Sequence, residues 1–88
     1  MISKAYAVTS TRQIVVAADE IPRTIYLQIA GNSTVYVGGA DVTASIGVPY
    51  EKHSSPHTVF VPQYENLYAV CADGVTESLR VLYPNLDA

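Results

Sequence analysis

Two histidines and one carboxylate pair have the types and spacing that could do chemistry. His53 and His57 stand four residues apart, a spacing at which two side chains on one helix face can share a metal ion. Pro56 lies between them, and a proline disfavours helical backbone at the preceding residue, so we expect solvated loop histidines. Asp19 and Glu20 are adjacent carboxylates, but neighbouring side chains on an extended chain point apart. We expect this pair to form a charged turn.

The other residues with reactive or ligand-binding side chains are expected to have structural roles. Cys71 is the one cysteine of the 88 residues, which excludes a disulfide within them and a zinc knuckle. It lies in the apolar run Leu67–Ala72, where we expect a buried and unreactive thiol. Asp41 is expected to form an Asx turn or to cap a short helix. Gly38 and Gly39 lack the following lysine that a phosphate loop requires. The sequence therefore predicts no catalytic residue, no metal, no cofactor and no enzymatic activity.

The charge of the chain argues against binding to nucleic acid or to an anionic membrane. Eight acidic residues against five basic ones give a formal net charge of −3, and the basic residues are scattered over positions Lys4, Arg12, Arg23, Lys52 and Arg80. Nonspecific binding to nucleic acid takes a clustered basic surface. The longest aliphatic run, Ile14–Ala18, is also far shorter than the roughly 20 residues of a membrane-spanning helix. No apolar segment of signal-peptide length stands at the N-terminus, so we expect the protein to stay in the compartment where it is made.

The composition and periodicity predict an all-β protein. Valine, isoleucine and threonine supply 25 of the 88 residues, and such β-branched side chains favour strands. Strand-like runs alternate with turn signals, and no segment has helical periodicity beyond one turn. We predict a small antiparallel β-sandwich or barrel of six to seven strands. The expected strands are Lys4–Thr9, Arg12–Ala18, Arg23–Ala30, Thr34–Gly38, His57–Pro62, Leu67–Ala72 and Val75–Tyr83.

Two of the turns predict hairpins, and one stretch predicts a long loop. Residues 31–33 join two expected strands and favour a hairpin with a three-residue loop. Residues 73–74, Asp-Gly, favour a second, tighter hairpin. Residues 38–56 lose the alternation and read as a loop of a length that usually carries function or stays mobile. Residues 13–88 form one domain, and residues 1–12 are either an N-terminal arm that adds a strand to a neighbouring sheet or the first strand of the domain.

Tyrosines suggest where another protein would bind. The chain has seven tyrosines and one phenylalanine, and several tyrosines lie opposite the aliphatic side of their strands. Such rings either form a half-exposed contact surface or complete the packing of the domain. The candidate protein-contact residues are Tyr26, Tyr36, Gly38, Gly39, Asp41, Tyr50 and Tyr68.

A resemblance to a family adds a functional expectation. The segment 34–49, TVYVGGADVTASIGVP, resembles a phrase of small bacteriophage virion proteins, in which a strand ending in Val-Tyr-Val-Gly-Gly leads to Asp-Val-Thr and a Gly-x-Pro stop. Residues 64–74 and 79–82 are similar to the hairpin that ends such domains. The resemblance implies a capsid decoration or cement protein.

The same resemblance implies the partners and the location. The protein would be a homo-oligomer, a trimer or dimer, that binds the major capsid protein noncovalently on the outer capsid surface of the virion and stabilises the assembled shell. Assembly would take place in the host cytoplasm, a reducing compartment in which a single free thiol is expected. Two alternatives remain at this stage: another phage structural component (head fibre, tail or head–tail junction part), and a module that binds a glycan or a cell-surface protein.

Overall fold

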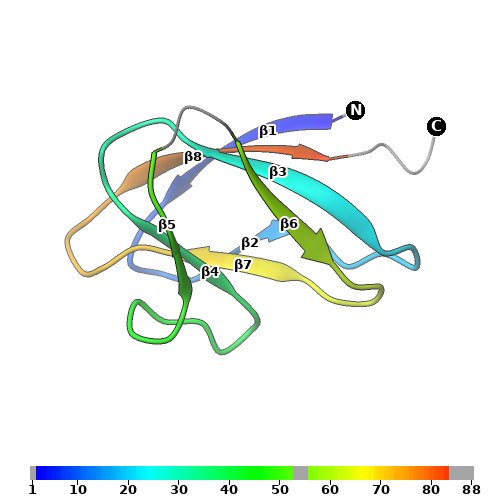
Figure 1. Cartoon of the computed structure of the whole chain (residues 1–88). Helices are drawn as coiled ribbons and strands as arrows, with labels where there is room; N and C mark the ends of the chain where they lie inside the picture. The colour runs from blue at the N-terminus through cyan, green and yellow to red at the C-terminus, as the bar shows by residue number, and fades with distance from the viewer. Residues whose placement is uncertain (1, 53–55, 84–88) are drawn as a thin grey trace.

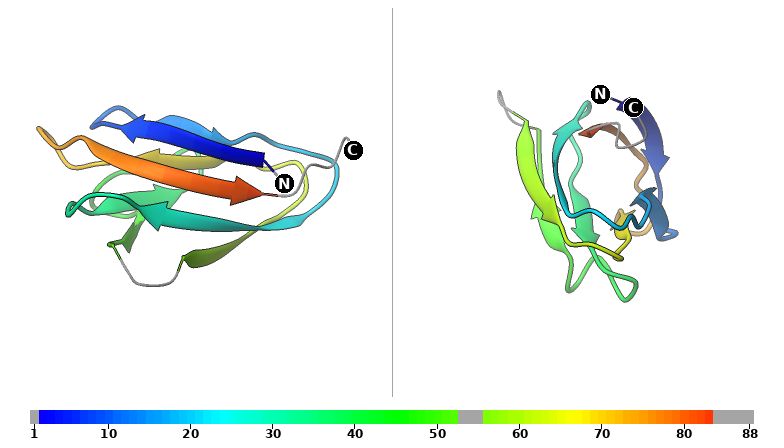
Figure 2. Two further views of the ribbon diagram at one scale, coloured as in Figure 1. Left: turned by 90° about the horizontal axis from the view of Figure 1, so that it is seen from above. Right: turned by 90° about the vertical axis from the view of Figure 1, so that its right-hand side faces the viewer.

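Two four-stranded antiparallel sheets face each other in the computed structural model, which describes residues 2–52 and 56–83 (Figure 1). Sheet A has the strand order β1-β8-β3-β6 and sheet B the order β2-β7-β4-β5. The end-on view in Figure 2 shows the two layers enclosing the interior between them. The strand bounds are Ile2–Val8 (β1), Gln13–Val16 (β2), Arg23–Ile29 (β3), Val35–Gly38 (β4), Val48–Tyr50 (β5), His57–Val61 (β6), Leu67–Val70 (β7) and Glu77–Tyr83 (β8).

The strand order is that of a jelly roll, the double-sheet arrangement built from two Greek keys. The structure confirms the predicted all-β antiparallel sandwich, and it adds one strand, β5, inside the stretch 38–56 that the sequence left as a loop. Within residues 2–52 and 56–83 there is no helix, and so none with the length and apolarity needed to cross a membrane. Residues 2–8 are β1, which pairs with β8 along its whole length.

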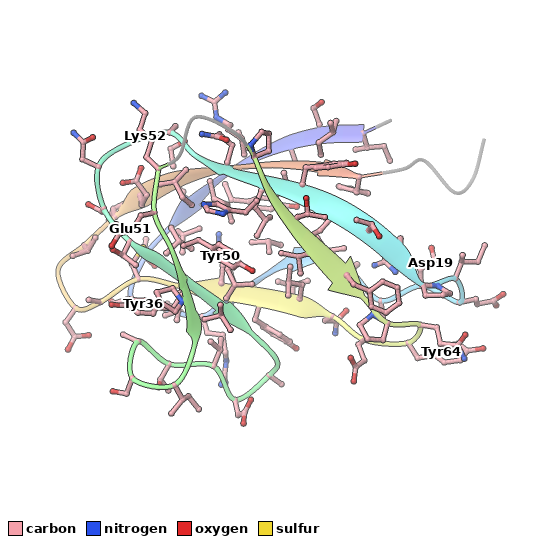
Figure 3. The ribbon with its side chains drawn as sticks, in the orientation of Figure 1. Asp19, Tyr36, Tyr50, Glu51, Lys52 and Tyr64 are labelled. Atoms are coloured by element: carbon pink, nitrogen blue, oxygen red, sulfur yellow. The ribbon has the colours of Figure 1, made fainter. Side chains whose placement is uncertain are left out.

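Both predicted hairpins are wrong, because the chain changes sheets at those turns. β3 belongs to sheet A and β4 to sheet B, and the same holds for β8 and β7. Among the described strands, β4 and β5 are the consecutive pair that stays in one sheet. The β2–β3 and β6–β7 connections meet at one end of the sandwich, where the Tyr64 N–H donates to the Asp19 carbonyl at 2.7 Å (Figure 3).

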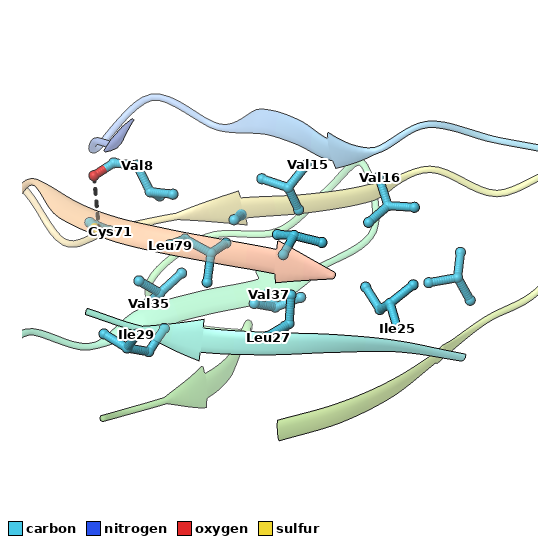
Figure 4. Packing of buried hydrophobic residues seen from close by; sticks show 13 residues of the cluster. Val8, Val15, Val16, Ile25, Leu27, Ile29, Val35, Val37, Cys71 and Leu79 are labelled. Carbon is cyan, nitrogen blue, oxygen red and sulfur yellow. Dashed lines mark hydrogen bonds between the residues drawn. The ribbon is translucent and has the colours of Figure 1, made fainter. Parts of the chain in front are cut away.

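The core lies between the sheets and is almost wholly aliphatic. Alternation along β3 turns Ile25, Leu27 and Ile29 inward, and all three are fully buried, as the sequence pattern predicts (Figure 4). Val35 and Val37 of β4 face them from sheet B. The remaining buried members of the cluster are Val8, Val15, Val16, Val61, Ala69, Cys71, Leu79 and Val81. A core of this kind positions the strands and leaves chemistry to the surface and to the loops.

Candidate interaction surfaces

The predicted histidine pair is only half described, and its described member has a structural role. His53 lies outside the described residues. The His57 Nε2 is 2.8 Å from the Glu51 carbonyl oxygen, and its ring lies 4.6 Å from that of Tyr50, centroid to centroid. These contacts tie β5 to β6 across the side of the sandwich. In the described part of the chain, no group of three or more His, Cys, Asp or Glu residues is arranged to hold a metal ion.

The adjacent carboxylates act as a turn, as the sequence predicts. The Ile21 N–H donates to Asp19 Oδ1 at 3.2 Å, which closes an Asx turn, and Glu20 is exposed. Arg23, which is buried, donates to the carbonyl oxygens of Ala17 and Ile21 and so fixes the same loop from inside.

Cys71 is buried and satisfied. Its side chain is 2% exposed, and its thiol donates to the Val8 carbonyl at 3.3 Å (Figure 4). Burial raises the pKa of the Cys71 thiol, and the negative charge of Glu77 raises it further. A thiol held in its neutral form in the core is a poor nucleophile. The structure thus agrees with the expectation of a buried, unreactive cysteine.

Glu77 is a buried anion that is absent from the predicted site residues. It is 6% exposed, and its carboxylate accepts backbone N–H bonds from Gly31 at 2.7 Å, Ser33 at 2.8 Å and Ser78 at 2.9 Å. Burial by itself raises the pKa of Glu77, but these backbone donors outweigh it, so the pKa lies below its ordinary value. Glu77 lies on the same side of β8 as the buried Leu79 and Val81, a signal that alternation could have provided. It clamps the β3–β4 connection where the chain leaves sheet A.

The seven predicted contact residues do not form one surface. Tyr26 lies on the outer face of sheet A and is 41% exposed. Gly39 and the exposed Asp41 belong to the β4–β5 loop, and Tyr50 is half-buried against the core. The others lie on the outer face of sheet B: Tyr36, Gly38 and Tyr68.

The outer face of sheet B is partly covered by the β4–β5 loop. Val42 of this loop is buried at 4% exposure and packs over Gly38, where an added Cβ would lie 3.0 Å from its nearer methyl group. Gly47 is closer still, because an added Cβ would lie 2.7 Å from both Tyr36 Cβ and Val42 Cγ2. Gly38 and Gly47 of the segment 34–49 therefore serve this packing inside the chain, whereas Gly39 has no comparably close contact.

The two edges of sheet B are blunted. β5 has three residues, and its central residue, Pro49, has no N–H to offer a further strand. β2 has four residues, and its register shifts between Ile14 and Val16, which marks a bulge. Short strands, prolines and bulges are the devices that prevent edge-to-edge pairing.

The edges of sheet A are longer and carry none of these interruptions. β1 spans seven residues and β6 five, with no proline or register shift inside either strand. The Gln13 side-chain amide donates to the Ala7 carbonyl at 3.4 Å, which places that carbonyl on the side of β1 away from β8. Because backbone groups alternate along a strand, the N–H and C=O groups of Ala5 and Ser3 face the same free edge. The described residues place no strand against this edge or against that of β6.

A groove crosses the outer face of sheet A next to the β1 edge. It has a volume of about 550 Å³ and is lined by Ser3, Lys4, Ala5, Tyr26, Leu27, Gln28, Pro56, Arg80, Val81 and Leu82. Small side chains of β1 form its outer border, whereas Tyr26 and Leu82 stand higher on the neighbouring strands. Among these residues are two cations, Lys4 and Arg80, and no carboxylate.

Comparison with known proteins supports the fold. No protein-family model and no curated protein matches the chain. The structure is similar to a chain of the Bacillus endospore appendages, which are described as a novel family of disulfide-linked pili. The TM-score is 0.61 at 17% sequence identity, and the match covers 93% of this chain and 82% of that chain. At this identity the likeness shows a shared fold.

The predicted function of a bacteriophage capsid decoration protein is wrong on this finding. The similar structure comes from a bacterial pilus and not from a phage particle. Of the residues that carried the phage resemblance, 34–49 form β4, its loop and the start of β5, where Gly38, Gly47 and Val42 pack together. Residues 64–74 and 79–82, which resembled a terminal hairpin, contribute to β7 and β8 in two different sheets. Because packing within the chain accounts for the segment 34–49, its sequence does not identify a binding partner.

Proposed function

We propose that this chain is a structural subunit that binds further copies of itself through the two edges of sheet A and builds an extended, pilus-like assembly. The observation that carries the proposal is the contrast between the sheets: the edges of sheet B are blunted by Pro49 and by the β2 bulge, whereas β1 and β6 are long and regular. An unprotected edge is a template for another strand. The fold shared with a pilus protein supports the same reading.

The directions of the strands allow head-to-tail growth. Each strand of sheet A runs antiparallel to its neighbour, so β6, three places from β1 in the order, runs opposite to β1. A second copy placed alongside in the same orientation would bring its β6 next to β1 as another antiparallel pair. The pairing uses two different edges and leaves a free edge at each end of the assembly, which makes it open-ended.

The contacts that we propose are noncovalent. The Bacillus appendages are described as disulfide-linked. A chain of subunits joined by disulfides needs two cysteines in each subunit, and these 88 residues contain one, which is buried. Backbone pairing along the sheet edges supplies an alternative link, in which several hydrogen bonds form together at each joint.

A proline at the free edge tests the proposal. Ala5→Pro removes an N–H that faces away from β8 and leaves the β1–β8 hydrogen bonds in place, because the partnered groups belong to the alternate residues. The matched control is Ala5→Ser, which keeps the N–H and a small side chain. Sedimentation velocity over a range of concentrations measures association, and negative-stain electron microscopy shows its products.

We expect the unsubstituted chain and Ala5→Ser to form concentration-dependent oligomers or fibres, and Ala5→Pro to remain monomeric with an unchanged β-sheet circular dichroism spectrum. A chain that stays monomeric up to millimolar concentration would refute self-assembly. Assembly of Ala5→Pro that matches Ala5→Ser would refute the role of the β1 edge.

A further inference from the structure

Phe60 is an exposed aromatic ring with no evident role inside the chain. It is the one phenylalanine in the sequence, and it is 63% exposed on β6. It pairs with Thr24 of β3, which is also exposed, so the ring lies on the outer face of sheet A. A large apolar ring at a sheet edge favours burial against a partner.

At the opposite edge of the same face, β1 carries small side chains, whereas β6 carries the large ring of Phe60. On β1 the residues that face outward are Ser3, Ala5 and Ala7, all exposed and all small. The groove begins over two of them, continues to Leu82 and Tyr26 on the neighbouring strands, and reaches Pro56 just before β6. One edge of the outer face therefore carries a projecting ring and the other a groove with an apolar floor.

We infer that the groove of sheet A binds Phe60 of a second copy of this chain, and that this contact selects the partner edge in the assembly; the inference rests on the proposed function. When β6 of one copy extends sheet A of the next, the outer faces become continuous, so Phe60 necessarily lies on the same face as Ser3 and Ala5. Side chains on neighbouring strands of one face are about 5 Å apart at Cβ. The ring thus reaches over the small residues of β1 toward Leu82.

Charge supports a second copy as the occupant. Arg80 places a cation in the groove, whereas Lys4 alternates with Ser3 and Ala5 and projects from the other face of β1 at the same edge. Antiparallel pairing brings the end of β6 and the turn after it toward the start of β1, where Lys4 lies. Close to that turn are three carboxylates, linked to it through the hydrogen bond between Tyr64 and Asp19: Asp19, Glu20 and Glu65. The contact therefore joins opposite charges around an apolar centre, which favours one partner and one direction of approach.

Two variants at exposed positions separate the groove from the ring. Phe60→Ala removes the ring and leaves the groove intact, while Ala5→Trp fills the groove and leaves the ring intact. Ile46→Ala is the matched control, because Ile46 is 65% exposed in the β4–β5 loop, away from sheet A. Each variant is first checked by circular dichroism and thermal unfolding, and association is then measured by sedimentation velocity, alone and in an equimolar mixture.

We expect Phe60→Ala and Ala5→Trp each to weaken self-association by about thirtyfold, the loss typical of a buried aromatic anchor, and Ile46→Ala to behave as the unsubstituted chain. The mixture should form a one-to-one complex that does not grow, since the ring of Ala5→Trp meets the groove of Phe60→Ala and no further contact remains. Added salt should weaken the complex, because charges surround the contact.

The outcomes distinguish this inference from the proposed function. If the unsubstituted chain assembles, Ala5→Pro does not, and Phe60→Ala assembles at full strength, the sheet edges pair but the groove does not select them. If the two single variants fail to assemble and their mixture also stays monomeric, Phe60 and the groove do not bind each other. An unsubstituted chain that never associates removes both proposals.

Discussion

The Glu77 clamp leads to a quantitative prediction for the substitution Glu77→Gln. The carboxylate accepts the Gly31 and Ser78 N–H groups at Oε1 and the Ser33 N–H at Oε2. A glutamine keeps one oxygen, which can retain the first two bonds in weakened form. Its amide nitrogen must then face the Ser33 N–H, donor against donor, in a buried site.

The magnitude follows from these contacts. An unsatisfied buried donor destabilises a protein by about 1–3 kcal/mol, and hydrogen bonds to an ionised group contribute more than neutral ones. We therefore expect Glu77→Gln to lower the free energy of unfolding by about 2–4 kcal/mol at neutral pH. Glu65→Gln is the control, since Glu65 is exposed in the β6–β7 turn and should change stability by less than about 0.5 kcal/mol.

The effect should depend on pH in one direction. The pKa of Glu77 in the folded protein lies below its ordinary value of 4.5. The stabilisation is therefore complete above the pKa of the unfolded chain and is lost as the pH falls through the lower pKa of the folded protein. Urea unfolding at pH 7 and at about pH 3, at concentrations low enough to keep the chain monomeric, measures both quantities.

Acid should reduce the difference in the free energy of unfolding between the unsubstituted chain and Glu77→Gln. Protonation of Glu77 removes the same charge that the substitution removes. The reasoning fails if Glu77→Gln is as stable as Glu65→Gln at pH 7, or if the difference between Glu77→Gln and the unsubstituted chain stays constant on acidification. Either result would mean that the three short contacts do not hold the β3–β4 connection.

Three further predictions concern packing, reactivity and backbone strain. Gly47→Ala should destabilise the fold by about 1–3 kcal/mol in urea unfolding, because its Cβ would clash with Tyr36 and a neighbouring loop residue; Gly39→Ala, whose Cβ meets nothing closer than 3.6 Å, should be nearly neutral, and equal losses would contradict this account. Cys71 should react with a water-soluble thiol reagent at least about a hundredfold more slowly in the folded protein than in urea, since it must wait for opening of the core; rapid labelling of the native state would show an accessible thiol. Tyr64 has φ of 65°, so Tyr64→Asn should raise the free energy of unfolding by about 1 kcal/mol, and a loss of stability would show that the ring itself holds the turn.

The sequence predicts the strands of this protein better than the way in which they pair. Alternation along residues 23–30 locates β3 and its buried face, because the local period of a strand depends only on which residues face the core. The sheet to which a strand belongs depends on long-range pairing, which residues 31–33 and 73–74 do not encode. Either connection is short enough to lead to a strand of the same sheet or of the other sheet, and here Glu77 binds the first of them to β8.

The strand β5, which was not predicted, and the wrong prediction of function have separate physical causes. β5 has a proline at its centre and two of its three residues exposed, so it carries no alternation to detect. It forms because β4 offers a free edge next to it. The phage resemblance rested on the phrase 34–49 and on residues 64–74 and 79–82, and two glycines of that phrase, Gly38 and Gly47, pack closely around Val42. The groove and Phe60 lie on one face of sheet A, toward opposite edges, because of the order of its strands, which no local pattern reveals.

The loop between β4 and β5 has a use that follows from its position. It lies over the outer face of sheet B, while both proposed contacts belong to sheet A. Foreign peptides inserted beside the exposed Ile46 would be presented once per subunit. They would lie on the face of the proposed polymer that takes no part in the contacts between subunits. A material assembled from such chains could carry an enzyme or an epitope at a fixed spacing, with the contacts between its subunits unchanged.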